Sequence, residues 1–204
     1  MNIAAVVLAA GGSKRLGSPK QLLRYGGASL LRHAAVAAMI ACHPVAVVLG
    51  SRADDLENEL HGLSVLALKN PAWGKGMGTS VRMGVESLHT LAPDIDGVLL
   101  TLCDQPLVGP GVLGQLCDAF ERAGSTRTIV AASYNRTRGV PAIFGRAHFD
   151  ELLALPDDAG AKSVLMKHHA SVIEVPLPEA AVDIDTREQY ERFMAAINNA
   201  RDGN

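Results

Sequence analysis

Cysteine and aromatic side chains are both scarce in this sequence. Its 204 residues include three cysteines, Cys42, Cys103 and Cys117, and no two of them form a C-x-x-C pair. An odd number of unclustered cysteines in a chain of this size argues against a disulfide framework, so we expect reduced thiols in a cytoplasmic protein. Aromatic residues make up only 4% of the chain. That composition favours small-residue helices packed on a sheet rich in valine and leucine.

The sequence also lacks a large excess of charge and a long apolar run. Its formal net charge of −2 argues against a sequence-blind nucleic-acid binder, which would have a basic surface. No uninterrupted apolar stretch reaches about 18 residues, so we expect no transmembrane helix. The apolar start of the chain has no charged leader and is cut short by Gly11 and Gly12, so we expect no signal peptide. Neither nucleic acid nor a membrane is an expected partner.

Several familiar motifs are absent too. The spacing of Gly12 and Gly17 fits a P-loop, but Ser18-Pro19 follows where that motif needs Lys-Ser/Thr, and the loop contains no G-x-G-x-x-G. The seven histidines show no H-x-x-H or H-E-x-x-H spacing, so we assign none of them to a metal. Neither Ser13 nor Ser80 has an identifiable His/Asp partner, so nucleophilic catalysis is not supported.

Short apolar runs do alternate with longer segments of helical spacing. We predict strands at 3–9, 45–49, 63–68, 98–102, 128–132, 142–144 and 172–175, and helices at 29–42, 52–61, 79–90, 111–123, 146–153, 160–169 and 186–198. This alternation predicts an α/β protein: a single domain over 1–204 with three layers, α/β/α, around a mostly parallel sheet. The rhythm is less regular after residue 128, which indicates one or two antiparallel strands and a substrate-facing elaboration.

The stretch 9–20 leaves the carboxyl end of the first predicted strand, where open α/β sheets bind their ligands. Gly11 and Gly12 allow a tight turn that exposes backbone N–H groups, and Lys14, Arg15 and Lys20 add positive charge. This chemistry fits a polyphosphate. On spacing alone, a solvated basic turn is an equally good interpretation.

Five motifs, in order along the chain, resemble those of the MocA/MobA-like nucleotidyltransferases of the molybdenum-cofactor type. They are L-A-A-G-G-S-K-R-L-G-S-P-K-Q-L-L at 8–23, N-P at 70–71 with G-M-G-T-S at 76–80, L-C-D-Q-P-L-V at 102–108, G-V-P at 139–141 and V-D-I-D-T at 182–186. The resemblance implies a nucleotide-diphospho-sugar-transferase fold, which is Rossmann-like. It also implies that the N-terminal half binds the nucleotide and the C-terminal half binds the acceptor.

The resemblance implies site roles residue by residue. Nucleotide contacts are expected from Leu8, Ala9, Ala10, Gly11, Gly12, Lys20, Gly76, Gly78 and Ser80; acceptor contacts from Gln105, Gly139 and Pro141; and catalytic roles for Arg15, Lys20 and Asp104. We expect Lys14 to be a solvated neighbour. Trp73, the only tryptophan, fits a packing anchor as well as a ligand contact, and the 76–80 loop fits a flexible turn capped by Thr79 as well as a nucleotide contact.

Mg²⁺ is the implied cofactor, because it binds through one or two carboxylates and completes its shell with phosphate oxygens and water. Asp104 follows a predicted strand and is the first expected ligand, although an Asx turn or helix cap before Pro106 is the alternative. Asp185 is the second expected ligand, with Asp183 as its rival. Because Glu188 lies three residues beyond Asp185, a capping role for Asp185 or Thr186 is also open.

The implied reaction is transfer of a cytidylyl group from CTP to molybdopterin cofactor with release of pyrophosphate. L-A-A-G at 8–11 resembles the cytidylyl branch of the family, while G-V-P at 139–141 replaces the G-H-P of many members, which puts the acceptor in doubt. A molybdenum hydroxylase is the implied client. The alternatives are use of GTP or another phosphorylated acceptor, an NAD(P)-dependent oxidoreductase on the same scaffold, and a non-catalytic cofactor-binding module.

Overall fold

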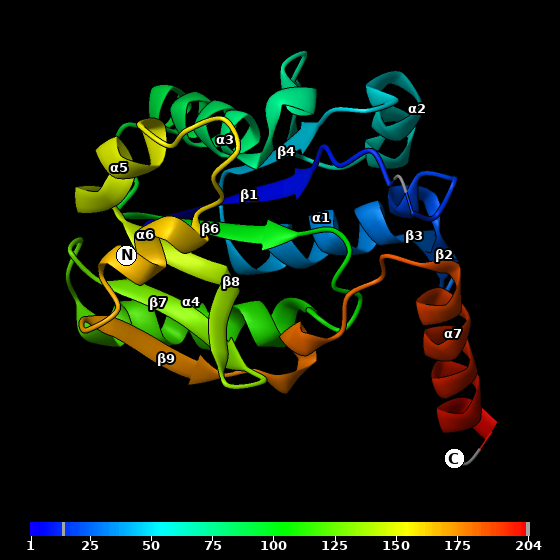
Figure 1. The fold of residues 1–204 in the computed structure, drawn as a ribbon. Coiled ribbons are helices and arrows are strands. Elements are labelled where there is room, and N and C mark those ends of the chain that lie inside the picture. The colour runs from blue at the N-terminus through cyan, green and yellow to red at the C-terminus, as the bar shows by residue number, and fades with distance from the viewer. Residues whose placement is uncertain (14, 203–204) are drawn as a thin grey trace.

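The structure is a computed structural model that describes residues 1–13 and 15–202; Lys14 lies outside the described residues. Seven strands of the described chain form one mixed sheet (Figure 1). They are β1 (Ile3–Ala9), β4 (Val45–Leu49), β5 (Leu66–Lys69), β6 (Gly97–Leu102), β7 (Ile129–Tyr134), β8 (Thr137–Gly145) and β9 (Val172–Pro176). The predicted α/β class is confirmed.

The sheet order is β5-β4-β1-β6-β8-β7-β9. β1 pairs in parallel with β4 and β6, and β4 pairs in parallel with β5. β8 is antiparallel to β6 and β7, while β9 is parallel to β7. The reversal comes from a two-residue turn at Asn135 and Arg136, whose φ angles of 47° and 58° are those of a primed hairpin turn. The expected antiparallel addition in the second half is therefore present.

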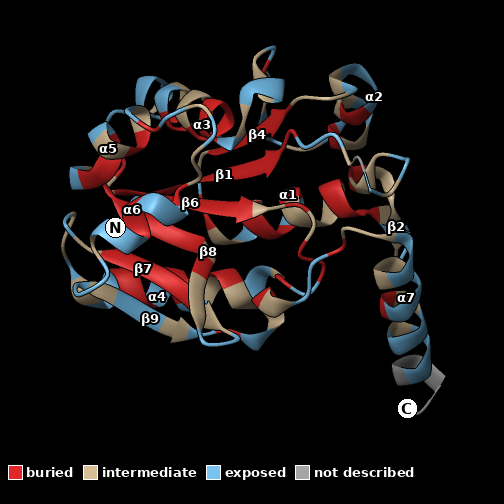
Figure 2. Cartoon of the chain, viewed as in Figure 1, coloured by how far each residue is buried: buried red, intermediate tan, exposed pale blue. Residues whose placement is uncertain are grey.

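Helices cover both faces of the sheet. One face packs against α1 (Leu30–Ala41), α2 (Ala53–Glu57) and α4 (Pro110–Ala123), and the other against α3 (Met77–Leu91), α5 (Phe149–Leu153) and α6 (Lys162–Lys167). Odd residues of β1 enter the first core cluster and even residues enter the second, as period-2 side chains require. Figure 2 shows that the central strands are buried, and this explains their apolar character on both faces.

A smaller apolar cluster ties the C-terminal helix to a short hairpin. The helix α7 (Arg187–Asp202) lies beside β2 (Arg24–Tyr25) and β3 (Ala28–Ser29), away from the main sheet (Figure 1). Leu30, Ile184 and Phe193 form the centre of this cluster. The hairpin was not predicted from sequence, because its two-residue strands are too short to carry a periodic pattern.

Other elements differ from prediction at their ends. The strand predicted at 63–68 runs from Leu66 to Lys69, and that predicted at 142–144 extends from Thr137 to Gly145. The helix predicted at 79–90 begins two residues earlier at Met77, with Gly76 as its N-cap. The segment 52–61 divides into α2 and a 3₁₀ turn, and 146–153 divides into a 3₁₀ turn η4 (Arg146–His148) and α5. Within the described chain, no helix has the length and apolarity to cross a membrane.

Candidate active site

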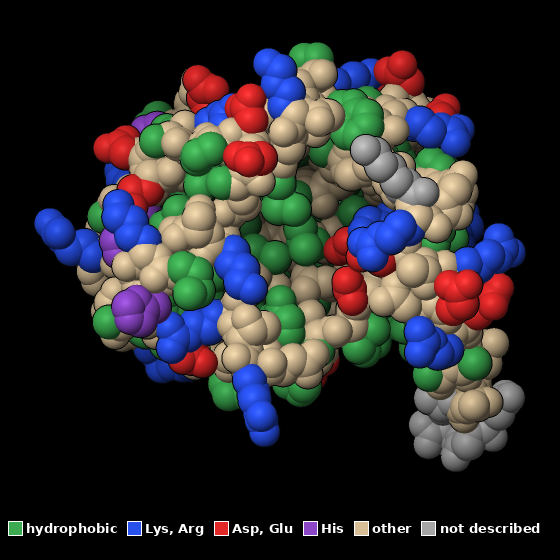
Figure 3. Space-filling view, viewed as in Figure 1, with side chains coloured by type: hydrophobic (Ala, Val, Ile, Leu, Met, Phe, Trp, Pro, Cys, Tyr) green, Lys and Arg blue, Asp and Glu red, His purple; other side chains and the backbone are tan. Residues whose placement is uncertain are grey.

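A cavity of about 300 Å³ lies at the carboxyl ends of β1 and β6, beside the start of α3. Figure 3 shows this hollow with apolar side chains at its base and acidic and basic side chains along one rim. Its walls include Leu8, Ala9, Ala10, Gly11, Gly12, Lys20, Gly76, Ser80 and Asp104. The structure thus brings together, at one edge of the sheet, residues that the sequence assigned to the nucleotide and the metal.

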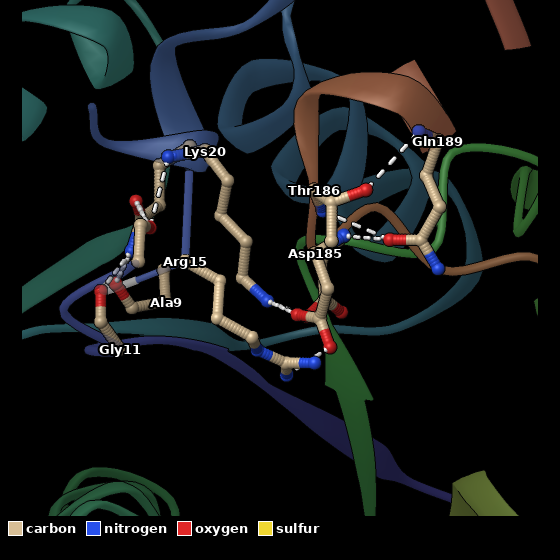
Figure 4. Close-up of polar contacts among 10 residues, drawn as sticks. Ala9, Gly11, Arg15, Lys20, Asp185, Thr186 and Gln189 are labelled. Atoms are coloured by element: carbon tan, nitrogen blue, oxygen red, sulfur yellow. Dashed lines mark hydrogen bonds and ion pairs between the residues drawn. The ribbon is translucent and has the colours of Figure 1, made fainter. Parts of the chain in front are cut away.

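A buried glutamine holds the first loop in shape. Gln21 Nε2 donates hydrogen bonds to the carbonyl oxygens of Ala9, at 2.9 Å, and Gly11, at 2.7 Å. Ser13 has a left-handed backbone, with φ of 48°, and its hydroxyl oxygen accepts a hydrogen bond from the backbone N–H of Lys20 at 2.9 Å. These bonds fold residues 9–20 back on themselves and direct the Lys20 side chain across the strand ends (Figure 4).

Lys20 lies between two carboxylates that come from distant parts of the chain. Its Nζ donates to Asp104, just beyond β6, and to Asp185 Oδ1, before α7, at 2.7 Å. The side chains of Lys20 and Asp104 are only 14% and 15% exposed. Arg15, which is mostly in solvent, donates to Asp185 Oδ2 at 2.5 Å (Figure 4). Two cations and two carboxylates therefore form one cluster at the mouth of the cavity.

The charges in this cluster stabilise one another. Burial by itself lowers the pKa of Lys20, but the charge of Asp104 and the hydrogen bonds to both carboxylates outweigh it, and the pKa is raised overall. Hydrogen bonding to Lys20, followed by the charges of Lys20 and Arg15, lowers the pKa of Asp185 in spite of its partial burial. Lys20 is therefore an ammonium and Asp185 a carboxylate throughout the physiological range.

The two carboxylates fit a divalent cation. Asp104 Oδ1 is buried and has no hydrogen-bond partner among the residues that the structure describes. An unsatisfied buried oxygen is costly unless a ligand completes it. Carboxylate oxygens are the ligands that Mg²⁺ and Mn²⁺ prefer, and Asp185 supplies further oxygens across the same lysine. Asp104 and Asp185 are therefore the residues that would hold such an ion.

The structure favours Asp185 over its rival Asp183. Ile184 is fully buried in the small apolar cluster, and its backbone N–H donates to Asp104 O at 2.9 Å, which fixes the segment against the end of β6. Asp185 then forms ion pairs with Lys20 and Arg15, whereas Asp183 is exposed and forms no ion pair within the described residues.

The cap of α7 is formed by Thr186 and not by Asp185. Thr186 Oγ1 accepts from the backbone N–H of Gln189 at 3.3 Å. Gln189 Oε1 accepts from the backbone N–H groups of Asp185 and Thr186, both at 2.8 Å (Figure 4). This is a capping box of Thr186 and Gln189, so Thr186 takes the capping role that the sequence left open, with Gln189 and not Glu188 as its partner. The arrangement leaves the Asp185 carboxylate available to the cations.

Hydrogen bonds of Asn70 and Thr79 hold the second glycine loop, at residues 76–80, in shape. Asn70 Nδ2 donates to the hydroxyl oxygens of Thr79 and Ser80, both at 2.9 Å, which joins the end of β5 to the start of α3. Thr79 Oγ1 donates to Gly76 O at 2.8 Å, so Thr79 does not cap the helix as the alternative interpretation suggested. The first turn of α3 therefore brings Ser80 to the cavity wall, while the N–H of Gly78 in the same turn donates to Asp157 O at 2.9 Å.

Gly76 and Gly78 have different surroundings. Gly76 lines the cavity, has a φ of 141°, and leaves no space for a Cβ, which would lie 2.3 Å from Asp157 O. Gly78 is buried behind this wall, where a Cβ would lie 2.0 Å from Pro156 O. The expected nucleotide contact of Gly78 therefore has a competing explanation in packing against residues 156–159.

The three expected acceptor residues lie in or beside β8 and do not line the cavity. Gln105 Nε2 donates to Val140 O at 3.2 Å and to Ala180 O at 2.8 Å, so it joins the sheet to the segment before α7. Gly139 leaves room for Tyr134, whose hydroxyl would lie 2.5 Å from a Cβ there, and Pro141 is buried in β8. Gln105 Oε1 has no hydrogen-bond partner within the described part of the chain.

Sequence reasoning missed Gln21, which shapes the cavity, and left the role of Trp73 open between a packing anchor and a ligand contact. Gln21 was quoted within the first motif but was given no role, and nothing in its spacing shows that it clamps the loop. Trp73 lines the cavity and covers the loop, since a Cβ on Gly12 would lie 3.0 Å from its ring. In the sequence, Trp73 directly precedes the second glycine loop. A large flat ring next to a glycine turn indicates that the ring packs over exposed backbone.

A mostly parallel sheet with a glycine loop, a largely buried lysine and two carboxylates at its carboxyl edge is typical of a nucleotide-binding α/β protein. The chain belongs to the family described as the MobA-like NTP transferase domain, which matches residues 5–172. This assignment confirms the resemblance drawn from the five motifs and places the protein among the nucleotidyltransferases.

Two curated relatives cover nearly the whole chain. Nicotine blue oxidoreductase of Paenarthrobacter nicotinovorans is 29% identical over 94% of this chain and 96% of its own length. Molybdenum cofactor cytidylyltransferase of Escherichia coli is 23% identical over 92% of this chain and 93% of its own. The relatives thus differ in their named activities.

Solved structures agree on the architecture. Rv0371c of Mycobacterium tuberculosis is 30% identical, with a TM-score of 0.77 over 96% of this chain and 99% of that one. It has also been solved in complex with manganese, with a TM-score of 0.71 to this chain. A nucleotidyl transferase from Methanothermobacter, 23% identical, has a TM-score of 0.80 over 98% of this chain and 99% of its own, which shows the common fold.

Proposed function

We propose that this protein transfers a cytidylyl group from CTP to the terminal phosphate of a molybdopterin cofactor and releases pyrophosphate. One observation carries the proposal: Lys20 of the glycine loop and the carboxylates of Asp104 and Asp185 converge at the mouth of one cavity. Anionic phosphates need the cation, a bridging metal needs the carboxylates, and phosphoryl-type transfer needs both together.

In this proposal the N-terminal half of the chain binds the nucleotide. The backbone of Gly11 and Gly12 lies at the cavity wall, where its N–H groups can approach the triphosphate. Lys20 contributes a fixed positive charge, and Arg15 adds a fork that matches two phosphate oxygens. The N-terminal turn of α3 with Ser80 faces the same space and serves the base or ribose.

The chemistry requires charge neutralisation and alignment but no covalent enzyme intermediate. Bound Mg²⁺ would neutralise charge on the phosphates and leaving pyrophosphate, with Asp104 and Asp185 as its protein ligands. Lys20 stabilises the charge that develops at the α-phosphate, and the Trp73 ring limits access of water to the loop. A related structure holds manganese, which supports a divalent cation in this proposal.

The choice of CTP and of a pterin acceptor rests on narrower grounds. L-A-A-G at 8–11 supports cytidine, and the relationship to the Escherichia coli cytidylyltransferase supports the pterin. In the C-terminal half, Gln105, Gly139 and Pro141 support the acceptor wall, where Val140 stands in place of a histidine. A molybdenum hydroxylase would then be the client that receives the product.

Pyrophosphate release tests the proposal directly. The purified chain is incubated with molybdopterin and with CTP, GTP, ATP or UTP in turn, with and without Mg²⁺. Turnover with CTP that depends on both the metal and the pterin is the expected result. In parallel, CTP at 100 times its dissociation constant should stabilise the fold by about 2.7 kcal/mol. Turnover with GTP alone would instead favour the guanylyl alternative.

An oxidoreductase is a second candidate because of the relationship to nicotine blue oxidoreductase. Against this candidate, no acidic residue stands directly after β4, where dinucleotide-binding proteins place the one that hydrogen-bonds the ribose. The nearby Asp54 and Asp55 are instead paired with Lys69 and Arg52, respectively, on the surface. A thermal shift produced by NADH or NADPH, and by no nucleoside triphosphate, would establish this candidate and reject the transferase.

A further inference from the structure

Three ligand-type side chains meet at the edge of the sheet opposite the cavity. His148 ends η4, Glu151 lies in α5, and His168 follows the last turn of α6. The pairing of Gly145 with Gly97, the first residue of β6, places these elements at the amino ends of the parallel strands. None of the three residues lines the cavity, and the proposed transfer uses none of them.

The distances between these side chains match those of a metal site. His148 Nδ1 lies 3.2 Å from Glu151 Oε1, and His168 Nε2 lies 2.7 Å from the same oxygen. All three ligand atoms lie within 4.8 Å of one another. Two ligands bound tetrahedrally to zinc at about 2.0–2.1 Å are separated by about 3.3 Å. Small side-chain adjustments therefore bring all three atoms to coordination distance.

The hydrogen bonding of His148 supports the same conclusion. Its Nε2 lies 2.9 Å from Arg127 O, and a carbonyl can only accept, so Nε2 carries the proton. Its Nδ1 then faces Glu151 Oε1, and either a second ring proton or a metal ion can lie between these two atoms. A ligating histidine that donates its other N–H to a carbonyl is the common second-shell arrangement at metal sites. The His148 side chain is mostly buried, which fixes this orientation.

We infer that His148, Glu151 and His168 form a binding site for a divalent transition metal, for which zinc is the probe. The two imidazoles and one carboxylate supply three ligands and leave one position open to water. Lys167 binds the other carboxylate oxygen, Oε2, at 2.6 Å, so Oε1 stays directed at the histidines. The histidines were not assigned to a metal from sequence because spacings of three and seventeen residues match no local motif.

The position of the site indicates a structural role. The ion would join α5 to the end of α6 and so close the loop 154–161 between them. That loop supports the second glycine loop: Asp157 O accepts from Gly78 N at 2.9 Å, and Arg82 donates to Leu155 O and to the Asp157 carboxylate. The inferred metal therefore braces the wall of the cavity from behind.

Metal binding to the full chain tests this inference. Chelator-treated protein is titrated with Zn²⁺ by calorimetry and with Co²⁺ by visible absorption, which reports nitrogen ligands. We expect one site per chain, weakened at least about tenfold in His168→Ala and in Glu151→Gln. His169→Ala removes the neighbouring exposed histidine and should bind like the wild type. Asp104→Asn, which alters the carboxylate pair at the cavity, should also leave the Co²⁺ spectrum unchanged.

Several results would overturn the inference. These are a titration without saturable binding, equal losses in His168→Ala and His169→Ala, or a spectrum that disappears in Asp104→Asn and persists in His168→Ala. Thermal unfolding gives a second readout: Zn²⁺ should raise the midpoint of wild type and His169→Ala but not that of His168→Ala. If His168→Ala does not fold, Glu151→Gln, which keeps the shape of the side chain but removes its charge, provides the same comparison.

Discussion

Lys20 is the residue on which the charge balance of the cavity depends. Its ammonium is largely buried between Asp104 and Asp185, and its backbone N–H is held by Ser13. A fixed cation of this kind needs no reorganisation when negative charge develops on a phosphate, which is why preorganised donors contribute so much to catalysis. The side chain also prevents the two carboxylates from repelling each other.

Replacement of Lys20 by methionine should reduce kcat/KM by about 10²- to 10³-fold, the usual effect of removing one preorganised partner. The substitution keeps the length and apolar stem of the side chain but removes its charge. Steady-state pyrophosphate release measures the effect. Lys162, the first residue of α6, is exposed. Lys162→Met is therefore the matched control and should retain wild-type turnover. An equal loss in both variants would remove Lys20 from the catalytic machinery.

The two aspartates near α7 should respond differently to substitution. Because Asp185 faces Lys20 and Asp183 does not, Asp185→Asn should raise the Mg²⁺ concentration for half-maximal activity at least about tenfold. Asp183→Asn should leave the Mg²⁺ dependence near that of the wild type. Activity measured across a Mg²⁺ series separates the two, and the opposite ranking would transfer the ligand role to Asp183.

At the residue scale, the sequence predicted which residues lie near the strand ends better than it predicted which way their side chains face. Asp104, Lys20 and the glycines followed from a motif at a strand end, which fixes where a residue lies along the chain. The choice between Asp183 and Asp185 depends on which face of the segment Ile184 buries, and that is a tertiary contact. The clamp by Gln21 was not predictable for the same reason.

At the scale of elements, the second glycine loop depends on the segment behind it. Gly76 has no space for a side chain because Asp157 O occupies it, and its φ of 141° is open only to glycine. The loop therefore takes its shape from residues 154–161 as well as from its own sequence. The start of α3, and with it Ser80, is placed by the same contact.

Gly76→Ala should destabilise the fold by about 1–3 kcal/mol, the usual range for a strained backbone residue. It should also weaken CTP binding, because the cavity wall must move. Gly74→Ala is a suitable control, since nothing lies within 4 Å of a Cβ there. Urea unfolding and CTP-dependent thermal shifts measure both effects. Equal stability of the two variants would show that the loop relaxes without strain.

The predicted elements were most accurate where a periodic pattern was long. The bounds of β1 and β4 match the prediction at both ends, because both strands are uninterrupted buried apolar runs, and Pro44 and Gly50 also flank β4. Short elements such as the β2–β3 hairpin have too few residues to show a period. The early start of α3 depends on Asn70 and on the loop 154–161, neither of which acts through local propensity.

At the scale of the whole molecule, the sheet order brings three remote segments to one edge. The β1 loop, the end of β6 and the segment before α7 meet through Lys20, Asp104 and Asp185. The alternation of strands and helices predicted the parallel core and its ligand edge. An antiparallel strand in the second half was predicted, but its insertion between β6 and β7 was not, because strand order is set by packing and not by period.

The ion cluster should make stability depend on pH in a defined way. The pKa of Asp185 is lowered from 3.8, so its contribution is present above pH 3.8 and is lost as the pH falls through the lowered value. The pKa of Lys20 is raised from 10.5, so its contribution is complete below pH 10.5 and is lost above the raised value. The cluster is therefore fully formed between these limits.

The difference in unfolding free energy between the wild type and Asp185→Asn should consequently be constant across neutral pH and shrink below pH 3.8. Urea unfolding at a series of pH values measures this difference. Asp183→Asn controls for the loss of one carboxylate and should show a smaller dependence. A wild-type advantage that grows as the pH falls would contradict the assigned direction.

The lysine seated between two acids gives the protein a tethered counter-ion of its own. A free divalent ion must compete with the Lys20 ammonium, which is covalently part of the chain. The carboxylates of Asp104 and Asp185 therefore attract such an ion weakly. The competition changes when a polyphosphate arrives, since the ammonium then gains a second anionic partner. If the proposed transfer holds, we therefore expect the nucleotide to bring its metal to Asp104 and Asp185, and free divalent ions to bind this pair weakly.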